Sequence, residues 1–348
     1  MKATCLLSGI AALVGAATVT AAPPLYRPIQ LKGWAPENAG DCFLTSADLG
    51  LSHATDFSVA MRVTFPETLA AKAAVLSLGD PATHQVTLTV HKGNYAYLSS
   101  AHETGGTNVL LGEWKIPTGE EGLDPALIPG KTKDIALTYT AATKTFALWI
   151  DGKQQALTLN TSASNSNDDP AAPTLKREVA FPALRLSGRI YGDNAGNYTL
   201  AGGAYANVGV FGFALNAAQV AQLHAANATL ESFVALQGNV VTVDFAAKEG
   251  VTSQAWQAEW DGKVVLIRGT GTLEVAGTAA PKELLLADGA ALTVRCKMGV
   301  GIVAQDLLTV GDGATVSADF TGLPERSGAY AVLSDKAGTT IPPLRSAT

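Results

Sequence analysis

Charged residues and cysteine are both scarce in this 348-residue sequence. Only 16% of the residues are charged, against 47% that are hydrophobic, and this balance excludes disorder driven by low hydrophobicity and high charge. Lysine and arginine total 24 against 30 acidic residues, for a net charge of −6. The chain therefore lacks the basic excess typical of proteins that bind a phosphate backbone, and we expect no nucleic-acid partner.

A single apolar run at the amino terminus approaches membrane-spanning length, and no second one follows it. Met1 and Lys2 precede an apolar stretch from Leu6 to Val19, after which small residues lead into two prolines. This order is typical of a secretory signal peptide over residues 1–22, and the stretch is shorter than the roughly 20 residues that a membrane-spanning helix needs. We expect a secreted or surface-displayed protein with no transmembrane segment after cleavage.

Two of the three cysteines, Cys42 and Cys296, remain once the signal peptide is removed. In an oxidising compartment these two thiols could form a disulfide. Each lies in a strand-like run, where a lone cysteine is usually a small buried hydrophobic residue. The sequence favours two unpaired thiols and leaves the disulfide open.

Glycine (35 residues) and proline (16) divide the chain into short segments that alternate between apolar and polar residues. From Phe57 to Phe65 every second residue is large and apolar, which is the period of a half-buried strand. Lys92-Gly93 and Asp151-Gly152 are typical hairpin turns. Further strands are predicted at residues 84–90, 94–99, 134–140, 144–150 and 206–211. This pattern predicts an antiparallel β-sandwich.

One segment has a helical pattern instead. Asn216 is a suitable N-cap, Val220 and Leu223 share one face, and Asn227 is suited to the end of the segment. We therefore expect a short helix after the last strand of the sandwich.

Three segments carry a family likeness: residues 130–139 (GKTKDIALTY), 146–153 (FALWIDGK) and 206–216 (ANVGVFGFALN). They resemble the laminin-G-like, concanavalin-A-like jelly-roll family of secreted proteins over about residues 35–228. The resemblance implies a two-sheet jelly roll whose members mostly bind carbohydrate or protein, some through calcium, while a minority are hydrolases or lyases. The glucanase members carry a Glu-x-Asp-x-x-Glu strand, which this sequence lacks.

After about residue 228 the pattern changes to short apolar runs separated by glycine, aspartate and alanine. Leu273, Leu292 and Leu308 recur in similar runs at separations of 19 and 16 residues. Such spacing is typical of the rungs of a parallel β-solenoid. The run from 308 to 316 also resembles the strand repeats of bacterial autotransporter passengers. For residues 229–348 we predict a solenoid-like domain, with ordinary hairpins as the alternative, so that the whole fold is all-β.

Three aromatic residues are candidates for ligand binding. Tyr95 and Tyr97 point to the same face of their strand, and Trp149 points away from the core side chains of its own. Exposed aromatic rings on a sheet stack on the apolar faces of sugars. The alternative is that other parts of the fold cover these rings.

Two loops rich in asparagine and aspartate are candidates for a calcium site. They contain Asp168 and Asp169 in one loop and Asp193 and Asn194 in the other. Calcium prefers such oxygen ligands, but the same residues are common in solvated turns. Calcium therefore stays a possible cofactor and no other is indicated.

The sequence favours a non-catalytic binding or adhesion protein that recognises a glycan or a surface protein. It contains no nucleophile motif and no closely spaced histidine pair for zinc, so no catalytic residue is assigned. A polysaccharide hydrolase or lyase is the second hypothesis and would need two carboxylates flanking one groove. A purely structural envelope component is the third.

Overall fold

The computed structural model describes residues 26–31, 34–38, 41–45, 48–80, 83–104, 107–119, 122–161, 173–175, 178–190, 198–237, 240–247, 252–296, 300–311, 313–319 and 333–335. The predicted signal peptide, residues 1–22, lies outside these ranges. Within them, no helix is both long enough and apolar enough to cross a membrane.

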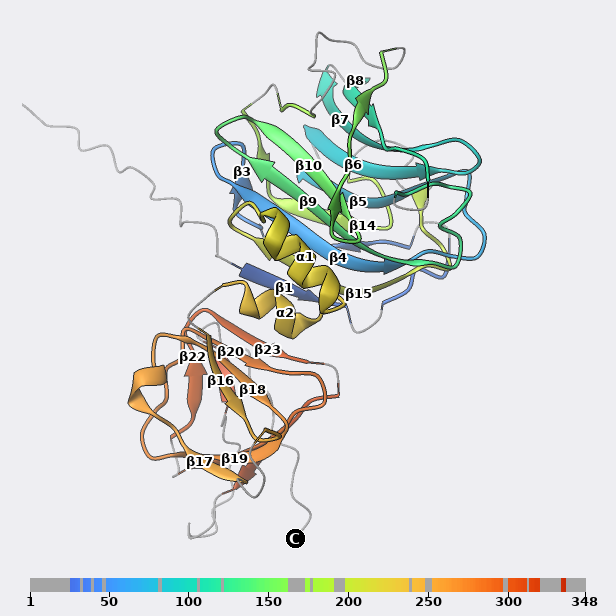
Figure 1. Cartoon of the computed structure of the whole chain (residues 1–348). Helices are drawn as coiled ribbons and strands as arrows, with labels where there is room; N and C mark the ends of the chain where they lie inside the picture. Colours follow the sequence, from blue (N-terminus) through green and yellow to red (C-terminus); the bar gives the residue numbers. More distant parts are fainter. Residues whose placement is uncertain are drawn as a thin grey trace, which may run out of the picture.

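Two antiparallel sheets form a sandwich in the first part of the chain, as predicted (Figure 1). The six-stranded sheet has the order β1 (Tyr26–Gln30), β15 (Ala204–Phe211), β4 (Phe57–Thr64), β9 (Thr132–Thr140), β10 (Thr145–Ile150), β11 (Lys153–Gln154). The seven-stranded sheet has the order β12 (Thr158–Leu159), β8 (Thr107–Lys115), β7 (Ala96–Thr104), β6 (His84–His91), β5 (Lys72–Asp80), β14 (Ala183–Leu186), β2 (Phe43–Leu44). A short sheet pairs β3 (Leu51–Ser52) with β13 (Ala180–Phe181).

Strand β4 has the predicted alternation, but its second face is also buried in the first half of the strand. Phe57, Val59, Met61 and Val63 are fully buried in the core between the two sheets. On the opposite face, Ser58 is also inaccessible and Ala60 is 2% exposed, because Ala60 packs in a second apolar cluster on the far side of the sheet. A polar residue such as serine was expected to mark the solvent side, and here it marks a face covered by other elements.

The predicted hairpins form where glycine or aspartate adopts the left-handed conformation. Gly93, between β6 and β7, has φ +68°, and the pair Asp151 and Gly152, between β10 and β11, has φ +49° and +81°. Positive φ at both central residues matches the twist of the flanking strands, which is why Asp-Gly is favoured at this position.

An aromatic cluster fills one part of the sandwich core. The rings of Phe57, Tyr139, Phe146 and Phe181 lie 4.8 to 6.4 Å apart between centroids. Elsewhere in the core Tyr205 is fully buried, and its hydroxyl donates to Val75 O at 2.6 Å and accepts from Ser187 N at 3.1 Å. Burial raises the pKa of Tyr205, so this hydroxyl stays protonated and both sheets remain joined through it.

Two helices follow the last strand of the sandwich. Helix α1 (Ala217–Ala225) begins after Asn216, whose side chain accepts from Gln219 N at 3.0 Å while Gln219 reaches back to Asn216 N at 2.9 Å. This capping box satisfies two backbone donors at the helix start. Val220 and Leu223 are buried, which confirms the predicted face. Helix α2 (Leu230–Ala235) begins after its N-cap Thr229.

The last part of the chain is a parallel coil. One sheet stacks β16 (Val240–Asp244), β18 (Val264–Arg268), β20 (Glu283–Leu286) and β23 (Leu307–Val310). A second stacks β17 (Ser253–Ala255), β19 (Thr270–Val275), β21 (Ala291–Cys296) and β24 (Thr315–Asp319), and a third pairs β22 (Ile302–Ala304) with β25 (Leu333–Asp335). All of these pairs are parallel, whereas hairpins would pair antiparallel. The described strands of this part therefore form parallel stacks and not hairpins.

The repeat that we predicted has a different register from the one observed. Leu273 is paired with Val294 in the neighbouring rung, and Leu292 with Val316. Leu308 belongs to another sheet, where its partner is Leu284. The predicted alignment of the three leucines is therefore wrong, because each coil contains more than one leucine-rich strand and spacing alone does not say which strands stack.

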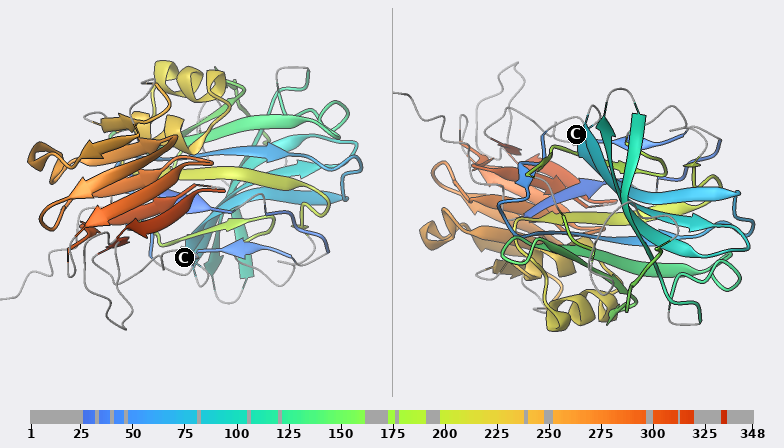
Figure 2. Two further views of the ribbon diagram at one scale, coloured as in Figure 1. Left: turned by 90° about the horizontal axis from the view of Figure 1, so that it is seen from below. Right: turned by 90° about the horizontal axis from the view of Figure 1, so that it is seen from above.

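The helices and the parallel coil share one apolar cluster with the six-stranded sheet. Phe233 of α2 contacts Phe211 of β15 edge to face at 5.8 Å, and Leu266 and Leu285 of the coil are buried in the same cluster. Arg268 of β18 also forms an ion pair of 2.6 Å with Glu231 of α2. Figure 1 shows α2 between the sandwich and the coil, and Figure 2 shows the coil as a separate stack beside the sandwich.

Candidate functional site

The three predicted aromatic residues do not lie together. Tyr97 is in β7 of the seven-stranded sheet and Tyr95 directly precedes that strand, with their rings 5.5 Å apart. Trp149 is in β10 of the other sheet, only 9% exposed, and packs in the apolar cluster that includes residues of α1. The structure thus brings the tyrosines together and separates Trp149 from them.

Tyr95 belongs to a polar network with two residues that the sequence did not indicate. Its hydroxyl donates to Glu113 Oε1 at 2.8 Å, and Asn160 Nδ2 donates to the same oxygen at 2.6 Å. Burial and the Glu113 carboxylate raise the pKa of Tyr95 to about 12, and burial raises the pKa of Tyr97. Both hydroxyls are therefore neutral hydrogen-bonding groups at physiological pH.

Three cationic side chains lie over tyrosine rings in the same area. Lys115 Nζ is 4.5 Å from the ring centroid of Tyr95. Arg189 Cζ is 4.1 Å, and Lys72 Nζ 5.9 Å, from the ring centroid of Tyr198. The charge of Arg189 acts on the hydroxyl of Tyr97, so the contacts around Tyr198 and those around Tyr95 belong to one area. We call this set the tyrosine face: Lys72, Tyr95, Tyr97, Glu113, Lys115, Asn160, Arg189 and Tyr198.

The floor beside the tyrosine face is polar and buried. Ser77, Thr87 and Thr89 on the same side of the sheet are fully inaccessible, and Ser77 Oγ lies 2.9 Å from Thr87 Oγ1. Ile190 N donates to Ser77 Oγ at 3.3 Å, which places the segment after β14 over this floor. Tyr95, Lys115 and Tyr198 are only half-buried, so the accessible part of the face lies around them.

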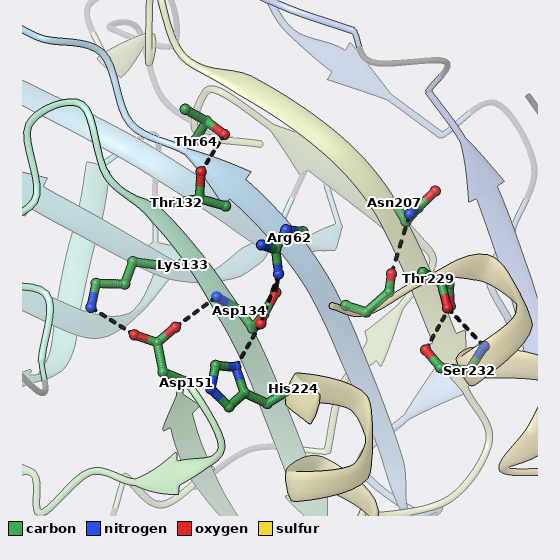
Figure 3. Close-up of polar contacts among 11 residues, drawn as sticks. Arg62, Thr64, Thr132, Lys133, Asp134, Asp151, Asn207, His224, Thr229 and Ser232 are labelled. Carbon is green, nitrogen blue, oxygen red and sulfur yellow. Dashed lines mark hydrogen bonds and ion pairs between the residues drawn. The ribbon is translucent and has the colours of Figure 1, made fainter. Parts of the chain in front are cut away.

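A second polar cluster lies on the outer side of the six-stranded sheet, beneath α1 (Figure 3). Asp134 accepts from Arg62 Nη1 through both carboxylate oxygens, at 2.9 and 3.0 Å, and pairs with His224 Nδ1 at 2.7 Å. Next to it, Asp151 pairs with Lys133 Nζ at 2.6 Å and accepts from Asp134 N at 3.0 Å. Five charged or titratable side chains from β4, β9, α1 and the hairpin after β10 thus meet at one place.

The positive and negative side chains of this cluster balance one another. Asp134, Asp151 and His224 each offer a ligand atom within 4.8 Å of the others, which is the one such group in the part of the chain that the structure describes. Arg62 and Lys133 already neutralise the two carboxylates. Calcium prefers six to eight oxygen ligands, which these three side chains do not supply. The contacts explain the cluster as a fastening that holds α1 on the sheet.

The predicted calcium residues Asp168, Asp169, Asp193 and Asn194 lie outside the described residues. Both described cysteines are free: Cys42 is half-buried, where its Sγ lies 3.1 Å from Arg185 Nε, and Cys296 is buried in β21. Burial raises the pKa of the Cys296 thiol, which therefore stays protonated.

Strand alternation predicted that Tyr95 and Tyr97 share one face of the sheet, but it did not indicate the residues around them. Asn160 and Arg189 come from segments far from β7 in the sequence, so no local spacing relates them to Tyr95. A signal was present in β8, where Glu113 and Lys115 flank Trp114. Because successive side chains of a strand point to opposite faces, Glu113 and Lys115 lie on the face opposite to Trp114. This alternation predicts the positions of both residues.

No protein-family model matches the sequence, and no curated protein sequence matches it. Among solved structures, the CBM40 of the Ruminococcus gnavus IT-sialidase, bound to alpha2,3 sialyllactose, is similar over 57% of this chain and 98% of its own, with 14% identity and a TM-score of 0.39. The binding domain of Paraclostridial Mosquitocidal Protein 1 is similar over 56% of this chain and 42% of its own, with 12% identity and a TM-score of 0.36.

The Trypanosoma rangeli sialidase in complex with the inhibitor DANA is similar over 49% of this chain, with 15% identity and a TM-score of 0.31. This chain covers 23% of the length of that sialidase. Similarity at this level transfers neither a ligand nor a site to the present chain.

Proposed function

We propose that this protein is a non-catalytic glycan-binding protein and that the tyrosine face holds the sugar. The observation that supports this is the pairing of half-buried aromatic rings with fixed hydrogen-bonding groups at one place. Tyr95 offers a ring, while Glu113 and Asn160 hold the hydroxyl of Tyr95 in one orientation. Sugars present an apolar ring face and a rim of hydroxyls, and such a site suits both.

Binding is favoured over hydrolysis by the carboxylates at the tyrosine face. Hydrolysis of a glycosidic bond ordinarily requires two carboxyl groups about 5 to 9.5 Å apart at one groove. Among the described residues, Glu113 is the one carboxylate that acts on both Tyr95 and Tyr97. That carboxylate is 8% exposed and accepts two hydrogen bonds, a setting that suits an anchor for the tyrosine.

A glycan array probed with the purified chain, with calcium and with chelator, tests this proposal. We expect specific binding that Tyr95→Ala abolishes and Tyr95→Phe reduces less, because phenylalanine keeps the ring and loses only the hydrogen bond to Glu113. Leu127→Ala is the matched control, since Leu127 is a large apolar residue, 44% exposed, outside the face. An array without binding in both conditions, or equal loss in Leu127→Ala, would contradict the proposal.

We further propose that the chain is exported through the segment 1–22 and acts at the cell surface or in the medium. The order of a basic start, an apolar stretch and small residues supports this. Amino-terminal sequencing of protein recovered from the medium or the cell envelope tests it, with a new terminus near residue 23 expected. Retention of Met1 on cytoplasmic material would overturn it. A structural envelope role is the second candidate, and a stable envelope fraction that binds no glycan would favour it.

A further inference from the structure

The cations of the tyrosine face have no anionic partner in the described structure. The ion pairs among described residues join Arg62, Lys133, His224, Arg268 and Arg295 to carboxylates, and none involves Lys72, Lys115 or Arg189. Elsewhere on this acidic protein, described arginines such as Arg62 and Arg295 contact two carboxylate oxygens each. Among the described residues, the tyrosine face thus carries three cations and the one carboxylate of Glu113, on a chain of net charge −6.

We propose that the tyrosine face binds sugars that carry a negative charge, with Lys115 and Arg189 as the residues that recognise the anion. This inference rests on the proposed function and adds the ligand class to it. Glu113 offsets one of the three positive charges, and its Oε1 is engaged by Tyr95 and Asn160. Three cations against one committed carboxylate leave a net attraction for an anion.

The geometry of Arg189 supports this role. Its guanidinium lies over the Tyr198 ring with Cζ 4.1 Å from the centroid, and its Nε is buried without a hydrogen-bond partner among the described residues. A guanidinium has five N–H donors in a planar fork that matches a carboxylate or a sulfate, and stacking on a ring leaves that fork free at its edge. The stacking holds the fork in place before a ligand arrives.

Lys115 extends the positive charge toward the aromatic ring that is proposed to contact the sugar. Its Nζ is 4.5 Å from the Tyr95 centroid, and its neighbour in the sheet across the strand pair is Tyr97. A sugar stacked at Tyr95 would thus have its charged substituent within reach of an ammonium group. The cation–π contact holds the ammonium group beside the ring, where it attracts an anionic ligand and offers no such attraction to an uncharged one.

Binding measured by calorimetry on matched sugars tests the inference. The probes are an oligogalacturonide, the same oligomer with its carboxylates methyl-esterified, and a sulfated galactan oligosaccharide, which carries sulfate and no carboxylate and so separates the two sources of charge. The variants are Lys115→Gln and Arg189→Gln, with Arg189→Lys to restore charge without the planar fork. Lys131→Gln is the control, because Lys131 is exposed and lies before β9 in the other sheet. This substitution removes the same unit of charge.

We expect a charged oligomer to bind at least about tenfold more tightly than the esterified one, and each glutamine variant at the face to lose about tenfold. Arg189→Lys should recover only part of that loss, and Lys131→Gln should match the unmodified chain. Equal binding of charged and esterified oligomers would overturn the inference and leave glycan binding standing. Absence of binding to any sugar would overturn the proposed function itself. An equal loss of affinity in Lys131→Gln would overturn the role of Lys115 and Arg189, because the attraction would then depend on net charge alone.

Discussion

The seven-stranded sheet of the sandwich and the parallel coil treat their charged side chains in opposite ways. On the outer face of the coil, Arg295 of β21 is paired with Glu274 of β19 at 2.9 Å and with Asp319 of β24 at 2.8 Å. On the seven-stranded sheet of the sandwich, Lys115 and Arg189 lie over tyrosine rings and outside any described ion pair. In the coil the charged side chains of neighbouring rungs pair with one another, whereas Lys115 and Arg189 of the sandwich contact aromatic rings.

The difference follows from the geometry of the strands. Parallel in-register stacking places Glu274, Arg295 and Asp319 at one level of successive rungs, so opposite charges meet directly. In the sandwich, the tyrosine face collects residues from β5, β7, β8 and the segment after β14, and no repeat relates them. The charged side chains in the row Glu274, Arg295 and Asp319, called the ladder below, are each paired with a neighbour in the next rung. The cations of the tyrosine face have no such neighbour in a repeat.

The largest expected effect concerns the apolar cluster that joins the two regions. Phe233→Ala should lower the free energy of unfolding by about 3–5 kcal/mol, because Phe233 is fully buried and its removal leaves a cavity. Urea unfolding followed by tryptophan fluorescence measures this. The half-buried Phe213, which contacts the same Phe211 ring at 5.5 Å, supplies the control, and Phe213→Ala should cost clearly less. Equal effects would mean that the junction is loosely packed.

The next effect concerns the fastening beneath α1. Asp134→Asn should lower the free energy of unfolding by about 1–3 kcal/mol, because it removes the charge that Arg62 and His224 share at a largely buried site. Thermal unfolding of the two proteins at one pH measures the change. A loss that disappears when Arg62 is also replaced by methionine would confirm that the unpaired cation causes it, and an undiminished loss would assign it to packing.

A pH-dependent effect is expected where the coil meets α2. Glu283 of β20 is 5% exposed, accepts from Gln237 Nε2 at 3.2 Å, and burial raises the pKa of its carboxyl above the ordinary value of 4.5. The folded chain thus holds this proton more tightly than the unfolded chain does, so its stabilising contribution is complete at low pH and is lost as the pH rises through the raised pKa.

Unfolding by urea between about pH 4 and about pH 8 should show this loss in the unmodified chain, and Glu283→Gln should reduce it. Glu259→Gln, at an exposed position of the coil, should leave the pH dependence unchanged. A pH profile that is the same in all three proteins would show that Glu283 ionises in the folded state without cost.

The smallest effect is expected in the ladder of the coil. Asp319→Asn should lower the free energy of unfolding only slightly, because Arg295 and Glu274 are exposed, Asp319 is half-buried and solvent screens the pair. The same measurement made for Asp134→Asn gives the comparison. A loss as large as that of Asp134→Asn would show that the ladder, and not the buried cluster, is where charge stabilises this protein.

Sequence reasoning succeeded where a feature depends on neighbours in the chain. The alternation in β4, the Asp151-Gly152 turn and the N-cap at Asn216 each depend on residues within a few positions, and all three are present. It failed where distant segments decide. The pairing of Leu308 with Leu284 depends on how three sheets divide each coil, and the burial of Trp149 depends on where α1 lies.

The candidate site shows the same limit. Strand alternation placed Tyr95 and Tyr97 on one face, but Asn160 and Arg189 reach that face only because the sandwich folds their segments over it. Charge totals gave no hint either, since the overall acidity of the chain hides a local positive surface.

The apolar cluster around α2 has a practical consequence for anyone who divides this chain. The boundary read from the sequence, near residue 228, separates Phe211 of the sandwich from Phe233 of α2 and from Leu266 of the coil, which share that cluster. A fragment ending there would expose a contiguous apolar patch to water, and such patches promote self-association. Expression of the sandwich alone is therefore expected to yield aggregating protein unless the fragment extends through α2 and the newly bared side of that helix is made polar.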